Sequence, residues 1–271
     1  MSSLSISVVI PVYKKDDPTH FVESLKSVTQ RQTCSPSEVV VVADGELTAE
    51  LNGVLENQDN LKIIRLEKNC GAGAARAAGV RSATHDLVAF QDSDDLSVPE
   101  RFERQTDHLY QRPNLDALGG YITEFEENPE EPHAVRKVPT APSKIASWGK
   151  IRSPLNQTTV MAKRESILTA GNYHPDDRME DYSLWARMLA KDMKLANLPS
   201  ILAKVRAGER EMSARRGGLE YAREEVRLQR DFYQMEFVNL PVAILNILIR
   251  VPVRLIPGHI LSWLYQKFLR R

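Results

Sequence analysis

The sequence is poor in cysteine, in net charge and in long hydrophobic runs. Its two cysteines, Cys34 and Cys70, form no C-x-x-C pair, so neither a zinc cluster nor a disulfide framework is indicated and a reducing cytosol is expected. The 36 basic residues balance 36 acidic residues, which argues against a protein that wraps nucleic acid through bulk charge. No basic segment precedes an apolar core near Met1, so the sequence predicts no signal peptide.

Two nucleotide-binding signatures are also missing. The chain has no G-x-x-x-x-G-K-[ST] motif, which argues against a P-loop nucleotidase. The stretch 69–79 begins like a G-x-G-x-x-G dinucleotide motif, but Arg76 stands at the third glycine position. With 42% hydrophobic residues over 271 positions, the chain suits one large domain, or a domain with an appendage, around a sizeable core.

The first hundred residues alternate β-branched runs with amphipathic stretches of ten residues or more. Such alternation is typical of right-handed βαβ units, which form a parallel sheet covered by helices on both faces. The predicted fold class is therefore α/β. Expected strands cover 5–10, 38–42, 62–66 and 87–90, and expected helices cover 18–30, 47–57 and 71–83.

The ends of these strands collect residues that can bind a ligand. Tyr13, Asp44, Asn69 and the aspartates within 92–95 each follow the carboxyl end of an expected strand. In open α/β sheets, ligands bind outside the carboxyl ends of the strands. These four distant parts of the sequence are therefore expected to meet at one edge of the sheet.

The aspartates form the densest cluster of charge at that edge. The apolar run 87–90 leads directly to Asp92, Asp94 and Asp95. Three carboxylates so close together repel one another, and a divalent cation that binds a diphosphate would compensate for this repulsion. The alternative is a simple turn with helix-capping residues, because Asp and Ser favour turns and Ser97 can cap a helix.

Beyond residue 99 the alternation becomes irregular. The acidic, proline-containing stretch 124–131 is read as solvated surface, and 206–218 as a mobile, arginine-rich segment. Expected strands cover 115–122, 158–162 and 201–205, and expected helices cover 99–111, 165–170, 178–193 and 219–236.

Two further groups of residues are candidates for chemistry. Arg76 would be unusual on a packed Ala/Gly helix unless it reaches an anion or an aspartate. Glu180 and Asp181 open the helix that contains Trp185. The helix dipole alone explains many acidic pairs in a first turn, but a carboxylate here can also act as a general base, with the tryptophan as a platform for a sugar ring.

Taken together and in order, these motifs resemble a family 2 glycosyltransferase with the GT-A fold. The resemblance covers about residues 5–215. It implies a Rossmann-like, mostly parallel central sheet flanked by helices, with a helical extension after it. The motifs are Val9-Ile10-Pro11-Val12-Tyr13, Asp44, Asn69-x-Gly71 with Ala75-Arg76, Phe90-Gln91-Asp92-Ser93-Asp94-Asp95, and Glu180-Asp181-Tyr182-x-Leu184-Trp185-x-Arg187.

The resemblance also implies a role for each candidate. Asp94 would bind the Mn²⁺ or Mg²⁺ that bridges the phosphates, and Asp95 would support it. Asp181 would be the catalytic base of an inverting displacement that deprotonates the acceptor. Glu180 and Trp185 would shape the acceptor site. The nucleoside-diphosphate sugar, a UDP sugar in our expectation, would contact Pro11, Tyr13, Asp44, Asn69, Arg76 and Asp92.

The implied domains are a catalytic domain at 1–215 and a helical extension at 216–271. The nucleotide-sugar half would cover about 1–98 and the acceptor half about 99–215. The sequence departs from the family pattern at Ala77-Ala78 and at Gln91, and it lacks a histidine after Arg206. The late phosphate contact is therefore left open among Arg206, Arg210, Arg215 and Arg216.

The last 35 residues, 237–271, contain five basic residues and no acid. Their longest uncharged runs, 237–249 and 255–266, are thirteen and twelve residues, whereas a spanning helix needs about 20. We therefore expect this tail to lie on an anionic membrane, which implies a cytoplasmic enzyme, peripheral on the inner face of the membrane, beside a glycan or lipid-linked acceptor. The alternative is a helical hairpin packed on the catalytic domain or on a partner subunit.

Two other functions remain open at this stage. A nucleotidyltransferase also combines an α/β sheet with metal-binding carboxylates, but it typically has a glycine-rich loop after the first strand, and residues 11–15 contain no glycine. A non-catalytic protein could keep the same fold and use its tail to dock on a membrane or a partner. The intact order of Asp44, Asp92, Asp94 and Asp181 argues against such a loss of function.

Overall fold

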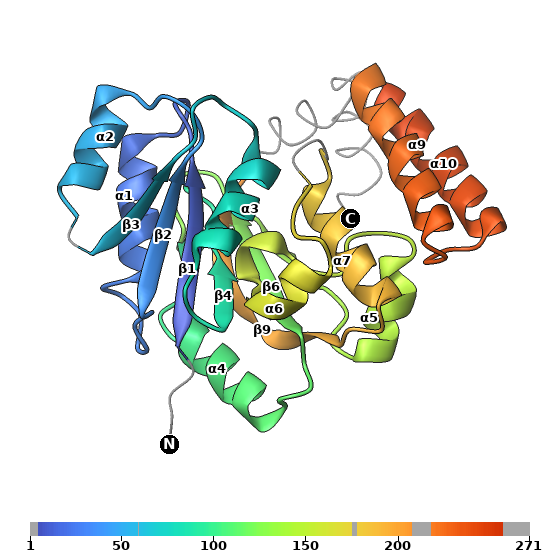
Figure 1. Ribbon diagram of the computed structural model, residues 1–271, viewed down its shortest axis with the longest axis horizontal. Helices are drawn as coiled ribbons and strands as arrows, with labels where there is room; N and C mark the ends of the chain where they lie inside the picture. Colours follow the sequence, from blue (N-terminus) through green and yellow to red (C-terminus); the bar gives the residue numbers. More distant parts are fainter. Residues whose placement is uncertain (1–4, 59, 175–177, 208–217, 257–271) are drawn as a thin grey trace.

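The computed structural model describes residues 5–58, 60–174, 178–207 and 218–256. Within them, nine strands form one sheet in the order β3-β2-β1-β4-β8-β6-β9-β5, with β7 paired to β6 (Figure 1). The strands are β1 (Ile6–Val12), β2 (Glu38–Ala43), β3 (Leu61–Arg65), β4 (Leu87–Phe90), β5 (Leu96–Ser97), β6 (Ala117–Phe125), β7 (Ala134–Arg136), β8 (Met161–Lys163) and β9 (Leu195–Arg206).

The sheet has a parallel half and a mixed half. Strands β3, β2, β1 and β4 are parallel, as the βαβ pattern predicts. Strand β8 runs antiparallel to both β4 and β6, so β6 points the same way as β4, and β9 is parallel to β6. The carboxyl ends of β1, β2, β4, β6 and β9 therefore share one edge. This confirms the α/β class and the edge expected for the ligand.

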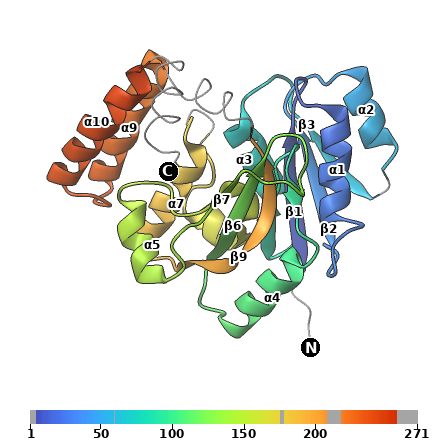
Figure 2. The same ribbon diagram turned by 180° about the vertical axis from the view of Figure 1, so that it is seen from behind.

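The helices cover both faces of the sheet because successive strand residues point to opposite sides. On β1, Val9 packs against α3 in one core cluster, whereas Val8 and Ile10 pack against α1 in the other. Figures 1 and 2 show the two layers from front and back. The helices of this body are α1 (Pro18–Val28), α2 (Ala49–Glu56), α3 (Ala72–Ser82), α4 (Arg101–Gln111), α5 (Pro142–Gly149), α6 (Arg164–Thr169) and α7 (Glu180–Ala190), with a 3-10 turn η1 (Gln157–Thr159).

Two more helices, α9 (Leu219–Gln234) and α10 (Leu240–Leu255), lie side by side at one end of the molecule (Figures 1 and 2). They pack on the body through a small aromatic core in which the rings of Tyr182 and Phe232 meet edge to face at 5.0 Å. The alternative expectation, a helical hairpin packed on the catalytic domain, therefore holds in part: the tail supplies α10, whereas the other arm of the hairpin, α9, precedes the tail. The rest of the tail and the domain boundary at 215–216 lie outside the described residues.

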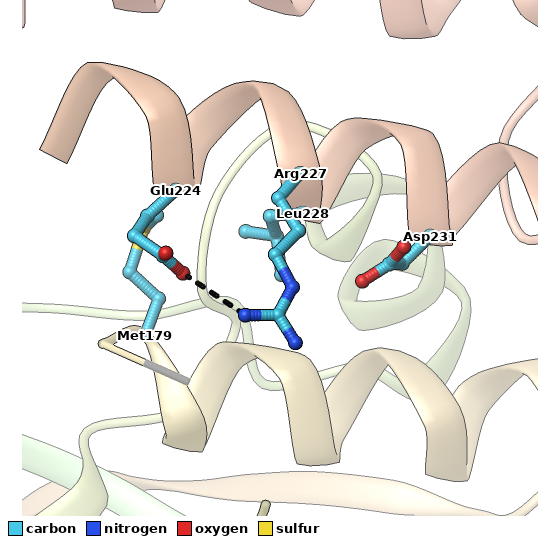
Figure 3. A pocket seen from close by; sticks show the side chains of 5 residues that line it. All are labelled: Met179, Glu224, Arg227, Leu228 and Asp231. Atoms are coloured by element: carbon cyan, nitrogen blue, oxygen red, sulfur yellow. Dashed lines mark ion pairs between the residues drawn. The ribbon is translucent and has the colours of Figure 1, made fainter. Parts of the chain in front are cut away.

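Figure 3 shows the pocket between α9 and the turn before α7, lined by Met179, Glu224, Arg227, Leu228 and Asp231. Its volume of about 10 Å³ holds no more than one water molecule. The ion pair drawn there, between Glu224 and Arg227, is loose at 3.9 Å. This contact therefore joins α9 to α7 and leaves no room for a ligand.

Several boundaries differ from the expectation. The last strand is longer than the predicted 201–205, because β9 continues through Pro199 with an irregular register against β6. The predicted strand 158–162 is divided between η1 and β8. The short elements β5, β7 and α5 were not predicted. No helix in the described part of the chain is long and apolar enough to cross a bilayer.

Candidate active site

The three aspartates of the loop after β4 have different surroundings. Asp95 is buried and accepts hydrogen bonds from the backbone N–H of Arg206, at 3.1 Å, and from the Thr158 hydroxyl. Burial, together with the charges of Asp92 and Asp94, raises the pKa of Asp95 well above its usual range. Asp95 therefore fixes the loop from inside.

Asp94 is partly exposed beside other acids. Burial, together with the charges of Asp92 and Asp16, raises its pKa to about 6, while the charge of Arg206 opposes the shift. A carboxylate held among like charges in this way is stabilised by any cation that reaches it. Asp94 is accordingly the member of the cluster best placed to face a cation.

Asp16 is a residue that the sequence reasoning missed. One of its carboxylate oxygens, Oδ2, accepts from the backbone N–H of Tyr13 at 3.0 Å and from the hydroxyl of Ser93 at 2.8 Å. It thereby ties the loop after β1 to the aspartate loop after β4. Its spacing of three residues from Tyr13 gave no signal, because its partner Ser93 lies 77 residues away.

Arg76 joins the two halves of the site. Its guanidinium donates to Asp92 Oδ1 at 2.7 Å and to Glu180 Oε1 at 2.5 Å. Burial would lower the pKa of this arginine, but the two carboxylates raise it, so it remains a cation. Arg76 thus reaches an aspartate, one of the two kinds of partner that the sequence left open, and also an acid of α7.

The start of α7 lies close against α3. A Cβ added to Gly73 would lie 2.9 Å from the carbonyl oxygen of His174 and 3.1 Å from Glu180 Cβ. A glycine at this position allows the two helices to approach. Asp181, in the same first turn of α7, is partly exposed. The fold therefore brings the expected base to the edge that carries the aspartates.

Glu180 is more enclosed than Asp181. Burial raises the pKa of Glu180, Arg76 lowers it, and the neighbouring Asp181 raises it again. The sequence suggested that Glu180 contacts the acceptor. In the structure its carboxylate binds the arginine instead, so its effect on an acceptor would pass through the position of α7.

The expectation for Trp185 needs a correction. Its side chain is fully buried in the core, with its ring 6.3 Å from that of Tyr173 in an edge-to-face arrangement. The tryptophan therefore presents no ring face to a sugar. The helical spacing of Tyr182, Trp185 and Leu189 predicted a buried face, and that reading of the pattern is the one that holds.

Asp44 orders the loop before α3. Its two carboxylate oxygens accept from the backbone N–H groups of Cys70 and Gly71 at 2.7 and 2.8 Å. Gly71 has a φ of +88°, which a glycine adopts without strain. Asn69 is exposed beside this loop, and Tyr13 and Pro11 are partly exposed at the end of β1. The structure thus brings the expected nucleotide residues to the same edge.

A buried polar network lies under the aspartates. Arg101 is fully buried and donates to Gln91 Oε1 at 3.0 Å and to Ser97 Oγ at 2.8 Å. Burial lowers the pKa of Arg101 to about 9, while Asp92 and Asp95 raise it, so it is a cation at neutral pH. Gln91 departs from the apolar residue usual in the family because it bonds this arginine. No local pattern in the sequence indicates this hydrogen bond between Gln91 and Arg101.

Arg206 is the phosphate candidate that the structure places at the site. It ends β9 next to Asp95, and its guanidinium stacks over the ring of Phe125 at 4.7 Å. The other three candidates, Arg210, Arg215 and Arg216, lie outside the described residues. A separate cleft of about 440 Å³, lined in part by Pro99 and Lys204, includes none of the predicted site residues.

The carboxylates of the site could bind a metal ion only together with oxygens that a bound ligand supplies. Within the described ranges, no three His, Cys, Asp or Glu side chains are grouped to hold a metal. Asp92 is bound by Arg76 and Asp95 by Arg206 and Thr158, which leaves Asp94. Mg²⁺ and similar ions often bind through one or two carboxylates with the phosphates of a substrate supplying further oxygens. The donor set fits this arrangement rather than a resident metal centre.

Solved structures with the same architecture define the class. The chain superposes on TarS of *S. aureus* in complex with UDP-GlcNAc with a TM-score of 0.65, at 20% identity, over 85% of this chain and 67% of that one. For the mannosyltransferase PcManGT of *Pyrobaculum calidifontis*, in complex with GDP-Man and Mn²⁺, the TM-score is 0.63 at 16% identity, over 97% and 81%. The fold is the GT-A fold of glycosyltransferases.

Sequence comparison gives the family. Residues 7–169, more than half of the chain, match the model of Glycosyl transferase family 2. The chain is 36% identical over 268 residues to the UDP-Gal:alpha-D-GlcNAc-diphosphoundecaprenol beta-1,3-galactosyltransferase of *Escherichia coli*, covering 98% of this chain and 96% of that protein. It is 35% identical over 264 residues to the amylovoran biosynthesis glycosyltransferase AmsE of *Erwinia amylovora*, covering 96% and 98%. The chain belongs to glycosyl transferase family 2, and the protein is a glycosyltransferase.

Proposed function

We propose that this enzyme moves a sugar from a UDP-linked donor to a glycan or lipid-linked glycan, with inversion at the anomeric carbon. The observation that carries the proposal is the double contact of Arg76. By holding Asp92 and Glu180 together, it sets the aspartates of the donor side beside the first turn of α7, where Asp181 lies.

On the donor side, the loops after β1, β2 and β4 would bind the nucleotide. Tyr13 and Pro11 would lie against the base, Asn69 would contact the nucleotide from the loop that Asp44 orders, and Asp92 would contact the ribose. Arg76 would also contact the nucleotide from beside Asp92. The N-terminal end of α3 adds a favourable field for the diphosphate. These contacts are prepared before the donor arrives because hydrogen bonds already fix the loops.

On the metal side, Asp94 would bind Mn²⁺ or Mg²⁺ together with the diphosphate, and Asp95 would support it by fixing the loop. A divalent ion bound there would neutralise the charge that develops on the departing nucleoside diphosphate. Arg206, beside Asp95, would add a second positive charge near the same phosphates. The raised pKa of Asp94 supports this assignment, because such a carboxylate gains most from a cation.

On the acceptor side, Asp181 would take the proton from the acceptor hydroxyl. The resulting oxygen would attack the anomeric carbon from the face opposite the leaving diphosphate, which inverts the configuration. Glu180 would hold Asp181 in place through its bond to Arg76. A base in the first turn of a helix is well oriented because the helix fixes its backbone.

The substrates are proposed from the relatives. The *E. coli* enzyme uses UDP-Gal and a GlcNAc-diphosphoundecaprenol acceptor, as its name states, and the similarity extends over nearly the whole of both chains. We therefore propose a UDP sugar and a lipid-diphosphate-linked sugar as the substrates. Such an acceptor is anchored in a bilayer, so the enzyme would lie peripherally on the inner face of the membrane, with α10 toward it.

A transfer assay tests this function. The purified chain is incubated with labelled UDP-galactose, UDP-glucose, UDP-GlcNAc or GDP-mannose, a short-chain GlcNAc-diphospholipid and Mn²⁺ or Mg²⁺. We expect transfer from a UDP sugar only with metal present, and a loss of at least about 100-fold for Asp94→Ala and for Asp181→Asn. Asp107→Asn, an exposed aspartate on α4, serves as the matched control and should transfer normally.

Two results would contradict the proposal. Undiminished transfer by both site variants would remove the proposed mechanism. Transfer that is equally fast in excess chelator would show that the reaction needs no divalent metal. Arg206 would then be the first residue to test as the group that stabilises the leaving diphosphate.

A further inference from the structure

The helix α10 carries its charged side chains on the side that faces α9. Glu225 of α9 is fully buried, and it binds Arg250 at 2.7 Å and Arg254 at 3.3 Å, both from α10. One turn further along, Gln229 accepts from the side chain of Asn246 at 2.8 Å. The contact between these two helices is therefore built largely from polar side chains.

The polar residues of α10 form one row. Asn246, Arg250 and Arg254 follow one another at intervals of four, so they share a face of the helix. Asn246 also donates to the carbonyl oxygen of Lys150, and Arg250 to that of Ile151, in the body of the molecule. This row faces α9 and the catalytic domain.

The opposite side of α10 is apolar and exposed. Two rows at intervals of four make up most of this face, and each side chain keeps between 43% and 65% of its surface accessible. By contrast, the accessible side of α9 is mixed: it carries charged side chains such as Arg223, Arg227 and Arg230 as well as exposed apolar ones. The exposed apolar residues of α9 are Leu219, Val226 and Tyr233. The exposed apolar residues of α10 are Leu240, Ile244, Leu245, Leu248, Ile249, Val253 and Leu255.

The width of this face indicates what covers it. At 100° per residue, the apolar side chains span an arc of roughly 220° around α10. A seam for one partner helix uses a narrower stripe. A wide apolar face opposite a polar row is the pattern of a helix that lies in the plane of a membrane interface.

The sequence beyond α10 agrees with this occupant. Residues 257–271 follow the helix directly and include Trp263 and Tyr265, residue types that favour the interface of a bilayer. They also contain Lys267, Arg270 and Arg271 and no acid, which complements the negative charge of a phosphatidylglycerol-containing membrane.

We infer that α10 inserts its apolar face into the surface of a lipid bilayer. The ion cluster around Glu225 holds the charged side chains of α10 against α9 and thereby keeps them off this face. This inference rests on the proposed function, in which the enzyme acts beside a lipid-linked acceptor. It adds which surface of the enzyme contacts the membrane and which interaction holds it there. The expectation of an electrostatic anchor is corrected in part. Arg250 and Arg254 point toward Glu225 and away from the apolar face, so within the described residues the face of α10 that would meet lipid is hydrophobic.

Cosedimentation with vesicles tests the inference. The full chain is mixed with vesicles of pure phosphatidylcholine, or of phosphatidylethanolamine and phosphatidylglycerol, at low and high salt. We expect binding to both, with a salt-resistant part that is the same in each. Replacing Leu248 and Ile249 by serine should lower the partition coefficient at least about tenfold, because two half-exposed aliphatic side chains lose their transfer to lipid.

A matched variant controls for loss of surface hydrophobicity in general. Tyr110→Ser with Val135→Ser also removes two exposed apolar side chains, from α4 and β7, and should sediment like the parent chain. Circular dichroism checks that each variant is folded. Sedimentation velocity without lipid, over a range of protein concentrations, tests the other occupant, a second copy of the chain.

Three outcomes overturn the inference. The parent chain stays in the supernatant with every vesicle, or its binding disappears entirely at high salt, or it forms a dimer that the Leu248/Ile249 variant abolishes. The readout is independent of sugar transfer. A chain that binds vesicles but transfers nothing would refute the proposed function alone, and one that transfers sugar to a short-chain acceptor without binding vesicles would refute only the role of α10.

Discussion

Two ion clusters link separate elements of this molecule, and their charge patterns are opposite. At the active site one cation, Arg76, binds two carboxylates, Asp92 and Glu180. In the hairpin one carboxylate, Glu225, binds two guanidinium groups. Asp92 keeps 32% of its side chain accessible, whereas Glu225 keeps none. The first cluster can therefore exchange a partner with a ligand, and the second can only hold its helices.

The difference teaches how the same interaction serves two purposes. A buried ion pair adds little net stability, because removing the charges from water offsets most of the attraction, yet removing one partner is costly. At the candidate active site the ion cluster fixes the distance between the aspartate loop and the first turn of α7. In the hairpin it satisfies polar groups on the inside and leaves the outside apolar. The following variants test this contrast, from the largest expected effect to the smallest.

Replacing Arg76 by methionine should have the largest effect on catalysis. The variant keeps an unbranched side chain but removes the guanidinium, which leaves Asp92 and Glu180 to repel each other, so the start of α7 shifts away from the aspartates. We expect transfer to fall by about 100-fold or more, since a displacement of 1 Å can cost this much. Steady-state kinetics with Arg81→Met, an exposed arginine of the same helix, as control would measure it. Normal kcat in the Arg76 variant would show that the cluster is structural only.

Replacing Glu225 by glutamine should mainly affect stability. Two guanidinium groups then lose their counter-charge, and breaking such a pair costs about 3 kcal/mol of unfolding free energy. Transfer to a short-chain acceptor should change little. Urea unfolding followed by circular dichroism would measure the loss, with Glu224→Gln within about 0.5 kcal/mol of the parent because its ion pair is loose and exposed. A large loss of transfer with unchanged stability would contradict this prediction, because it would show that the Glu225 cluster serves catalysis rather than stability.

Gly73→Ala should have an intermediate effect. Its Cβ would lie 2.9 Å from the carbonyl oxygen of His174 and 3.1 Å from Glu180 Cβ, so the start of α7 must move. We expect kcat to fall about tenfold, or about 1.4 kcal/mol of transition-state stabilisation, with the metal dependence unchanged. Gly53→Ala is the matched control, because nothing lies within 4 Å of its Cβ and alanine favours the interior of α2. Unaltered kinetics for the first variant would mean that α7 tolerates the shift.

The smallest of these effects is the change in stability expected for Asp94→Asn in the absence of metal, and it depends on pH. Because burial raises the folded pKa of Asp94 from 3.8 to about 6, the folded state holds the proton more tightly than the unfolded state. This contribution to stability is present below about pH 4 and is lost as the pH rises through about 6. In chelator, the asparagine variant should therefore exceed the parent by about 1 kcal/mol at pH 7.5 and match it at pH 4, by urea unfolding. A variant that is less stable at pH 7.5 would contradict the account of this carboxylate.

Much of the fold could be predicted because its signals are local. Continuous valine runs such as 39–42, each followed by a turn and a helix, define the parallel half of the sheet without any knowledge of distant contacts. The same regularity placed Tyr13, Asp44 and the aspartates at one edge. The order of the motifs then identified the family before any coordinates were considered.

The remainder could not be predicted because it depends on pairs far apart in the sequence. Arg76 and Glu180 are separated by 104 residues, so the tie between the two halves of the site has no local pattern. Trp185 was assigned to the acceptor from its neighbours, but burial decided otherwise. Pro252 lies inside α10, and the helix continues past it because its exposed side tolerates a missing hydrogen bond.

The central claim is that different aspartates bind the donor and remove the proton. Calorimetric titration with UDP in the presence of Mn²⁺ tests this claim most directly. The Asp181→Asn variant should bind UDP and Mn²⁺ with the affinity of the parent chain while its transfer falls by at least about 100-fold. The Asp94→Asn variant should lose the metal-dependent part of the affinity. Loss of UDP binding in Asp181→Asn, together with full metal-dependent binding in Asp94→Asn, would contradict the account.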